Sequence, residues 1–192
     1  MSIEGSITAL VTPMNEKGDL DYNSLEKLIN FQIDSGISGL VAVGTTGESA
    51  TIDFEDHIKL IEFFIKISNG RVHIIAGTGA NSTEEALHLT REAKNLGADA
   101  ALLVSPYYNK PPQEGIYRHH AKIADEVDIP QILYNVPSRT ASFIEPETVQ
   151  RLSSHQNIMG IKDATGDMKN LSEVLKLLSL IHISEPTRPH CI

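Results

Sequence analysis

The sequence predicts an α/β fold in which strands and helices alternate and the strands form a parallel sheet. Short apolar, β-branched runs recur along the chain, and stretches with the apolar spacing of a helix lie between them. Glycine and polar residues collect directly after the runs. Each unit has roughly 30 residues, the length of a βαβ repeat. With 192 residues and 41% hydrophobic content, the chain can bury one sizeable core.

The apolar runs are the predicted strands. They are continuous rather than alternating, which is typical of strands that are buried on both faces of a parallel sheet. In order, they are Ile7 to Val11, Leu40 to Val43, Val72 to Ala76, Ala100 to Val104, Ile132 to Tyr134 and Ile158 to Ile161.

Helical spacing fills the gaps between these strands. The first predicted helix has its apolar face at Leu25, Leu28, Ile29 and Phe31. A later one has its apolar face at Ala86, Leu89, Ala93 and Leu96. Gly97 is the stop signal of that later helix, and Ser82 to Glu85 has the pattern of a capping box at its start. The last predicted helix covers about Met168 to Leu178.

Two architectures share this pattern, the doubly wound sheet and the (β/α)8 barrel. A dinucleotide-binding doubly wound sheet needs a Gly-rich turn after its first strand, and Thr12 to Asn15 offers none. In a parallel barrel, the carboxyl ends of all strands face one rim, where active sites are built. The segments that a barrel would gather there are Gly44 to Glu48, Gly77 to Asn81, Pro106 to Asn109 and Asn135 to Arg139.

Lys162 is the most informative single position, because it ends an apolar strand instead of lying on a helix surface. Burial disfavours the ammonium form and lowers the pKa of a lysine. The neutral amine could then attack a ketone and form a Schiff base. The alternative is a solvated or snorkelling side chain.

Two other side chains are placed to assist such chemistry. Tyr134 also ends an apolar run, and its phenol could carry protons as an acid in one step and a base in the next. Arg139 follows in a loop at the same rim, where its guanidinium could bind a carboxylate bidentately. A core tyrosine with a satisfied hydroxyl and a solvated loop arginine are the alternatives.

The turn from Gly44 to Glu48 resembles an anion cradle, because glycines let backbone N–H groups converge and Thr45 and Thr46 add hydroxyl donors. It lacks the lysine of a Walker loop. A plain strand-to-helix turn, with Glu48 in the first helical turn, is the alternative.

Several functions are excluded or disfavoured. The formal net charge of −9 disfavours nucleic acid as a partner. No stretch is apolar over the length of a membrane span, and Met1 to Leu10 has no basic residue before an apolar run, so we expect a cytoplasmic protein without membrane contact. The only cysteine is Cys191, which excludes an intramolecular disulfide. His119 and His120 are adjacent and should point to different helix faces, so we predict no metal and no cofactor.

Together, five segments resemble the dihydrodipicolinate synthase family of the pyruvate-dependent class I aldolases in both order and spacing. They are Val43 to Thr51, Ile75 to Asn81, Ser105 to Pro111, Leu133 to Thr140 and Gly160 to Gly166. The resemblance covers about residues 5–178. It implies a (β/α)8 barrel, present here as about six strand–helix units in residues 1–178.

The resemblance also implies an activity and a role for each site residue. The activity is the lyase-type condensation of pyruvate with L-aspartate 4-semialdehyde to 4-hydroxy-tetrahydrodipicolinate, in the diaminopimelate route to lysine. Lys162 would form the imine, Tyr134 would carry protons, and Thr45 and Thr46 would hold the pyruvate carboxylate. Arg139 would receive the carboxylate of the semialdehyde.

Further family properties concern assembly and regulation. Tyr108 would reach across a dimer interface to complete a relay with Thr45 and Tyr134, in a homotetramer built from dimers. Some relatives bind lysine as an inhibitor at that interface, and the matching positions are Ser49, Ala50, His57, Asn81, Glu85 and Tyr107. Phe54 stands where lysine-sensitive relatives often carry a histidine, so we expect weakened inhibition.

Residues 179–192 do not resemble the family, and we interpret them as a foreign or out-of-frame tail. A barrel that stops after six units should be marginally stable, so we expect this chain by itself to be inactive. The alternatives in function are another pyruvate-dependent aldolase, such as a sugar-acid lyase, and a non-catalytic binding paralogue. Sialic-acid lyases of the superfamily share the glycine–threonine loop and the strand lysine, but would not be expected to share Arg139.

Overall fold

The computed structural model of the chain describes residues 3–181. Its strands are β1 (Ile7–Ala9), β2 (Gly39–Ala42), β3 (His73–Gly77), β4 (Ala100–Val104), β5 (Gln131–Asn135) and β6 (Ile158–Asp163). Its helices are α1 (Tyr22–Asp34), α2 (Phe54–Ser68), α3 (Thr83–Leu96), α4 (Gln113–Glu126), α5 (Pro137–Thr140), α6 (Pro146–Leu152) and α7 (Met168–Ile181). Two 3-10 turns, η1 (Thr45–Gly47) and η2 (Ser49–Thr51), follow β2.

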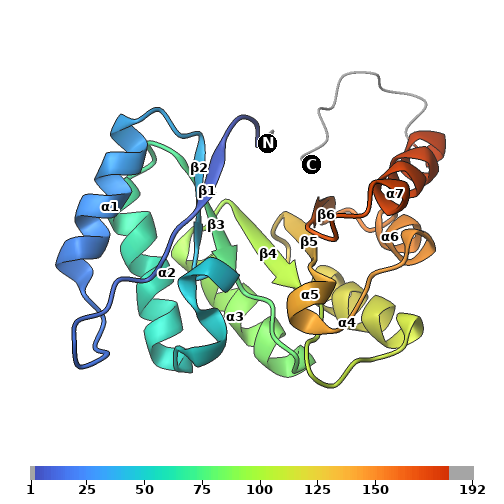
Figure 1. Cartoon of the computed structure of the whole chain (residues 1–192), viewed down its shortest axis with the longest axis horizontal. Coiled ribbons are helices and arrows are strands. Elements are labelled where there is room, and N and C mark those ends of the chain that lie inside the picture. The colour runs from blue at the N-terminus through green and yellow to red at the C-terminus, as the bar shows by residue number, and fades with distance from the viewer. Residues whose placement is uncertain (1–2, 182–192) are drawn as a thin grey trace.

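All six strands are parallel, and their order in the sheet is their order in the chain. The helices lie around the outer side of the sheet (Figure 1). A doubly wound sheet would reverse its strand order at a switch point, and this one does not. The fold is therefore the six-stranded part of a (β/α)8 barrel, as predicted. Within residues 3–181, β1 and β6 are edge strands without a second strand neighbour.

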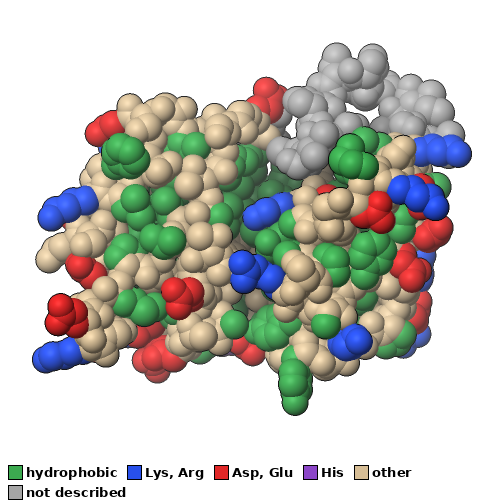
Figure 2. All heavy atoms as spheres, in the orientation of Figure 1, with side chains coloured by type: hydrophobic (Ala, Val, Ile, Leu, Met, Phe, Trp, Pro, Cys, Tyr) green, Lys and Arg blue, Asp and Glu red, His purple; other side chains and the backbone are tan. Residues whose placement is uncertain are grey.

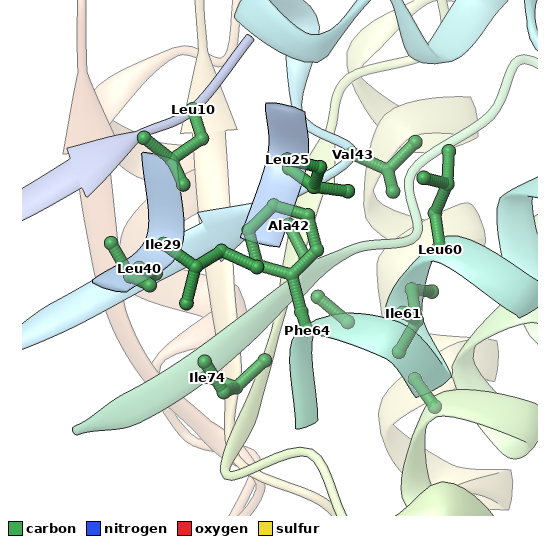
Figure 3. Packing of buried hydrophobic residues seen from close by; sticks show 12 residues of the cluster. Leu10, Leu25, Ile29, Leu40, Ala42, Val43, Leu60, Ile61, Phe64 and Ile74 are labelled. Carbon is green, nitrogen blue, oxygen red and sulfur yellow. The ribbon is translucent and has the colours of Figure 1, made fainter. Parts of the chain in front are cut away.

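The strands contribute to two apolar layers, because successive side chains point to opposite faces of a sheet. Leu40 and Ala42 of β2 face outward and pack with helices α1 and α2. Figure 3 shows Phe64 of α2 in this layer. The intervening residue Val41 belongs to the inner layer of the barrel. The inner layer is made of Ile3, Val41, Ile75, Ala100, Leu102, Ile132, Tyr134 and Val136.

The helix boundaries follow local capping chemistry. The Ser82 hydroxyl accepts a hydrogen bond from the Glu85 N–H at 3.4 Å, which caps α3 as predicted. Gly97 ends the same helix with φ of 95°, a left-handed conformation that glycine adopts without strain. One predicted core residue is wrong, because Phe31 is 62% exposed. It lies two residues from the buried Ile29, which turns it about 200° around the helix axis.

The last helix, α7, extends to Ile181 and therefore includes the first residues of the predicted tail. The rest of that tail, including Cys191, lies outside the described residues. Over residues 3–181, no helix combines the length and the apolar character needed to cross a membrane.

Candidate active site

Strand pairing brings Tyr134 and Lys162 together. In the register between β5 and β6, Tyr134 lies directly opposite Lys162. The Lys162 Nζ lies 4.3 Å from the centroid of the Tyr134 ring, within the range of a cation–π contact. Tyr134 is buried in the inner layer. Two residues that are 28 positions apart in the sequence thus form one chemical pair at the carboxyl edge of the sheet.

Burial shifts the protonation equilibrium of Lys162 toward the neutral amine. Burial lowers the pKa of Lys162 below its usual value. The side chain is half-buried rather than largely desolvated as the sequence suggested. Among the described residues, no carboxylate makes an ion pair with it that would hold the proton in place. An amine of this kind is a better nucleophile than a solvated lysine.

Thr45 and Thr46 lie in the turn η1, at the carboxyl end of β2. Thr45 is half-buried and Thr46 is exposed. The N–H groups of Gly47 and Ser49 donate to the Gly44 carbonyl, and that of Glu48 donates to Thr45. These three N–H groups are engaged within the turn, so a backbone cradle there would have to use the N–H groups of Thr45 and Thr46. The threonine side chains remain as candidate ligands.

The position of this turn depends on close backbone packing that the sequence analysis missed. Val43, just before the turn, has φ of 52°, a left-handed conformation that is rare for a β-branched residue. A Cβ on Gly77 would lie 2.9 Å from Gly44 Cα and closer still to the Val43 carbonyl oxygen. On the other side, the Thr12 hydroxyl donates to the Gly47 carbonyl at 2.7 Å. The turn is thus fixed from both sides.

Arg139 and Tyr108 are at the surface. Arg139 is exposed on α5, and among residues 3–181 it makes no ion pair. Tyr108 is 90% exposed, with φ of 70°. The structure does not bring Tyr108 into contact with Tyr134 or Thr45 within the single chain. Figure 2 shows a hollow between the two halves of the open barrel, with Lys or Arg side chains along its edge.

Three of the residues matched to a lysine effector site lie close together. Burial raises the pKa of the Tyr107 hydroxyl, and the nearby Glu85 carboxylate raises it further. Asn109 donates its side-chain N–H to the Asn81 carbonyl at 3.3 Å, in the same region. His57 is buried, and its Nε2 donates to the Gly77 carbonyl at 2.7 Å.

The other residues of that set belong to the loop before α2. Ser49 and Ala50 form part of the turn η2. Phe54, at the start of α2, packs edge-on against His88 with ring centroids 4.8 Å apart.

His119 and His120 both lie on the buried side of α4, although they were predicted to point to different faces. Their ring centroids are 5.0 Å apart. His119 bonds Thr83 through Nδ1 at 2.9 Å, whereas neither ring nitrogen of His120 has a partner. Within residues 3–181, no group of three or more His, Cys, Asp or Glu side chains could hold a metal ion.

Two surface pockets have neither Lys162 nor Tyr134 in their linings. One, of about 460 Å³, is lined in part by Asp19, Tyr22, Asp53 and Lys59. The other, of about 350 Å³, includes Tyr117 and His155. The candidate site is at Lys162 and not at either pocket, because Lys162 can act as a nucleophile. The inner face of an open barrel also need not form an enclosed cavity.

The fold and the site define a (β/α)8-type protein with a lysine–tyrosine pair at the carboxyl edge of its sheet. The profile of the Dihydrodipicolinate synthetase family matches residues 2–182. The chain belongs to this family.

Individual relatives agree with this assignment. A 4-hydroxy-tetrahydrodipicolinate synthase of Pseudomonas putida (strain W619) is 60% identical over 173 residues, which cover 90% of this chain and 59% of the relative. A dihydrodipicolinate synthase structure from Acinetobacter baumannii, complexed with pyruvate, has a TM-score of 0.91 and 53% identity, covering 93% of this chain and 61% of that one. A Cyanidioschyzon merolae structure with lysine bound has a TM-score of 0.88 and 38% identity, with coverage of 92% and 61%. The chain thus spans about 60% of the length of these relatives.

Proposed function

We propose that this chain carries the imine-forming half of a 4-hydroxy-tetrahydrodipicolinate synthase site, which condenses pyruvate with L-aspartate 4-semialdehyde. The observation that carries the proposal is the Lys162–Tyr134 pair, in which a lysine of lowered pKa lies 4.3 Å from a buried tyrosine ring. The relatives that match most of this chain bear the name of that enzyme, and one was solved with pyruvate.

The chemistry follows from a neutral amine beside a phenol. The Lys162 amine adds to the ketone carbon of pyruvate, and loss of water gives the imine. Removal of a methyl proton then gives an enamine, whose carbon attacks the aldehyde while the aldehyde oxygen gains a proton. Tyr134 carries these protons in alternating directions. The amine of the aldehyde substrate displaces Lys162 from the imine carbon, which closes the ring and frees the lysine.

The surface residues would orient the two substrates. Thr45 and Thr46 hold the pyruvate carboxylate from the turn η1, and Arg139 on α5 receives the carboxylate of the semialdehyde. Tyr108 is exposed and reaches no partner of the relay in its own chain. Its role therefore requires a second subunit, which supports a homo-oligomer built from dimers.

Condensation by the 192-residue chain alone should be weak. The edges of β1 and β6 have no strand neighbour within residues 3–181, so the inner layer that carries Tyr134 and Lys162 is not closed by a barrel wall there. We propose that residues 1–178 are the barrel part and that most of residues 179–192 is unrelated to it, although α7 continues to Ile181 and the family match to residue 182. An extended chain, in which residues 1–178 are joined to the C-terminal part of the Pseudomonas putida relative, should turn over far faster.

Lysine inhibition is a regulatory extension of the same proposal. Tyr107, Glu85 and Asn81 cluster as a lysine site would require, and a relative was solved with lysine bound. Phe54 packs against His88 and offers no hydrogen bond to a ligand. We therefore propose weak inhibition by lysine, which Phe54→His should strengthen in titrations of the extended chain.

The test is to trap the imine. Incubation of the extended chain with pyruvate and borohydride should add one pyruvate-derived mass to the peptide that contains Lys162, and Lys162→Ala should remove this labelling. Lys66→Ala, which changes an exposed lysine of α2, is the matched control and should label normally. Labelling elsewhere would overturn the assignment. Turnover of sugar aldehydes in place of the semialdehyde by the extended chain would favour a sugar-acid lyase, and no labelling at all would favour a binding protein.

A further inference from the structure

The residues that directly follow the chemical pair also pair with each other. Asn135 and Asp163 are opposite one another in the register of β5 and β6, one position beyond Tyr134 and Lys162. Because side chains alternate along a strand, they point to the outer face of the sheet while Tyr134 and Lys162 point inward. The backbone pairing continues past them, since the Ala164 N–H donates to the Asn135 carbonyl at 2.9 Å.

The two side chains connect the strand ends to the segments that follow them. Asn135 is fully buried and makes two bonds of 3.1 Å with the backbone of Ile144, donating to its carbonyl and accepting from its N–H. This fixes the chain after α5 against the end of β5.

Asp163 makes an equivalent connection on β6, with a carboxylate in place of the Asn135 amide. Its Oδ1 accepts from the Thr165 N–H at 2.8 Å and from the Thr165 hydroxyl at 2.6 Å. Its Oδ2 accepts from the side-chain N–H of Asn170 at 3.0 Å. Asn170 is itself buried, in the first turn of α7. The carboxylate therefore ties the end of β6 to the start of the next helix.

This arrangement matters because Asp163 is the chain neighbour of Lys162. A carboxylate close to an ammonium favours the charged form and makes the amine a poorer nucleophile. Both carboxylate oxygens of Asp163 are occupied on the outer face, and across residues 3–181 Lys162 has no ion-pair partner.

We propose that Asp163, acting through Asn170, is a positioning residue for Lys162: it holds the end of β6 on α7, so that the amine stays on the inner face beside Tyr134. The inference rests on the proposed function, because it assigns a purpose to Lys162. It concerns residues that do not touch the substrate. Asn135 performs the corresponding task for Tyr134 on β5.

The test is a swap that keeps size and net charge. D163N leaves one side-chain oxygen to accept from the donors of Thr165 and Asn170, and N170D places a carboxylate opposite the Asp163 carboxylate. The double variant D163N/N170D restores one hydrogen bond with its direction reversed. The chain offers Asn135→Asp as a parallel variant on β5, which removes the donor to the Ile144 carbonyl but keeps the acceptor.

Two readouts separate positioning from stability. The first is the pH midpoint for reductive methylation of Lys162 by formaldehyde, followed by peptide mass spectrometry, which needs no pyruvate. The second is the rate of pyruvate trapping by borohydride. D163N should move the midpoint toward that of the exposed Lys66, which is opposite to the shift that loss of a neighbouring carboxylate would cause by itself. It should also slow trapping by about tenfold to a hundredfold, as expected when a reacting group is misplaced. The double variant should restore at least half of both changes on a logarithmic scale.

The outcomes are distinct. If D163N lowers the unfolding temperature but leaves the midpoint unchanged and trapping within about twofold of the parent, Asp163 is structural only and the inference is wrong. The inference also fails if the swap shows no recovery. If the midpoint shifts as expected but the parent chain traps no pyruvate, the positioning role stands and the proposed function fails. Should D163N not fold, Thr165→Val replaces it and must shift the midpoint in the same direction. This variant removes the hydroxyl that donates to Asp163 and accepts from the Asp167 N–H.

Discussion

The candidate site has two parts that are built differently. Tyr134 and Lys162 are carried by adjacent strands, and the sheet register alone places them in contact. Thr45, Thr46 and Tyr108 are carried by segments after strands, and each is exposed or half-buried. In the single chain, none of these three contacts the lysine–tyrosine pair through a hydrogen bond among residues 3–181.

The difference shows which residues of a site are positioned by the hydrogen bonds of a parallel sheet alone. Backbone hydrogen bonds between strands fix the positions of strand residues once the sheet forms. Loop residues need additional fixing, and here it comes from the left-handed Val43, the close approach at Gly77 and the Thr12–Gly47 hydrogen bond. Tyr108 is 90% exposed and has no such fixing among residues 3–181.

The largest expected effect belongs to the strand-borne part. Tyr134→Phe should lower kcat of the extended chain by about 10² to 10⁴, because a proton carrier is lost while the ring beside Lys162 remains. Steady-state kinetics with both substrates provides the measurement, and KM for pyruvate should change little. A variant with kcat close to the parent would show that Tyr134 only packs against Lys162.

The second effect concerns the loop-borne part. Arg139→Ala should raise KM for the semialdehyde by about ten- to a hundredfold, because a bidentate carboxylate contact is worth on the order of 1.5–3 kcal/mol. KM for pyruvate should stay near the parent value. Arg118→Ala, which changes an exposed arginine of α4, is the control. Equal rises in both KM values would mean that Arg139 supports the fold of the rim instead.

These two parts were predictable from the sequence to different degrees. The strands, their order and the residue types at their ends follow from hydrophobic periodicity, and Lys162 and Tyr134 were identified because each ends an apolar run. Their contact could not be derived, since periodicity gives the face of a strand and not its offset from a neighbour.

The rest depends on tertiary packing that opposes local preferences. Val43 adopts a left-handed conformation that a β-branched residue avoids, so no propensity argument would place it there. The link from Asp163 to Asn170 joins two elements, and the burial of both His119 and His120 reflects packing on both sides of α4. Phe31 shows the opposite error, in which a residue counted with the apolar face of a predicted helix is exposed.

The third prediction tests whether close packing fixes the threonine turn. Gly77→Ala would insert a Cβ against the backbone of Val43 and Gly44, at a distance that real Cβ atoms essentially never show. We expect a loss of about 1–3 kcal/mol in stability from overpacking, together with a higher KM for pyruvate. Thermal unfolding and kinetics of the extended chain provide the two readouts. Gly70→Ala is a control for stability only, because it has open space around it, although its φ of 72° carries strain.

If Gly77→Ala destabilised the protein without any change in KM for pyruvate, the contact at Gly77 would not be needed to place Thr45 and Thr46 for pyruvate binding. The loop-borne part would then be fixed by Thr12 or by a partner subunit, and Thr12→Val would become the next variant to examine.

The last prediction concerns the helix behind the strand-borne part and affects stability at low pH instead of catalysis at neutral pH. Ile116 and Ala121 of α4 pack in the same cluster as Leu133 of β5 and Ile161 of β6. On that helix, burial lowers the pKa of His119 to about 4 and that of His120 well below its usual value. In the unfolded chain, both should titrate near 6.5. Below that pH the unfolded state binds more protons than the folded state, so stability is fully present above about 6.5 and falls as the pH decreases toward 4.

For His119 this should cost on the order of 2 kcal/mol at pH 5 relative to pH 7, and His120 should add a loss in the same direction. His120→Phe removes one titrating group and keeps an aromatic ring, so the loss between pH 7 and pH 5 should be smaller than in the parent. His88→Phe, at an exposed position of α3, should leave the loss nearly unchanged. Urea unfolding at pH 7 and pH 5 gives the comparison. If His120→Phe were as acid-sensitive as the parent, His120 would not contribute to the acid response, which would then arise from other groups such as His119 and the buried His57, whose pKa burial also lowers.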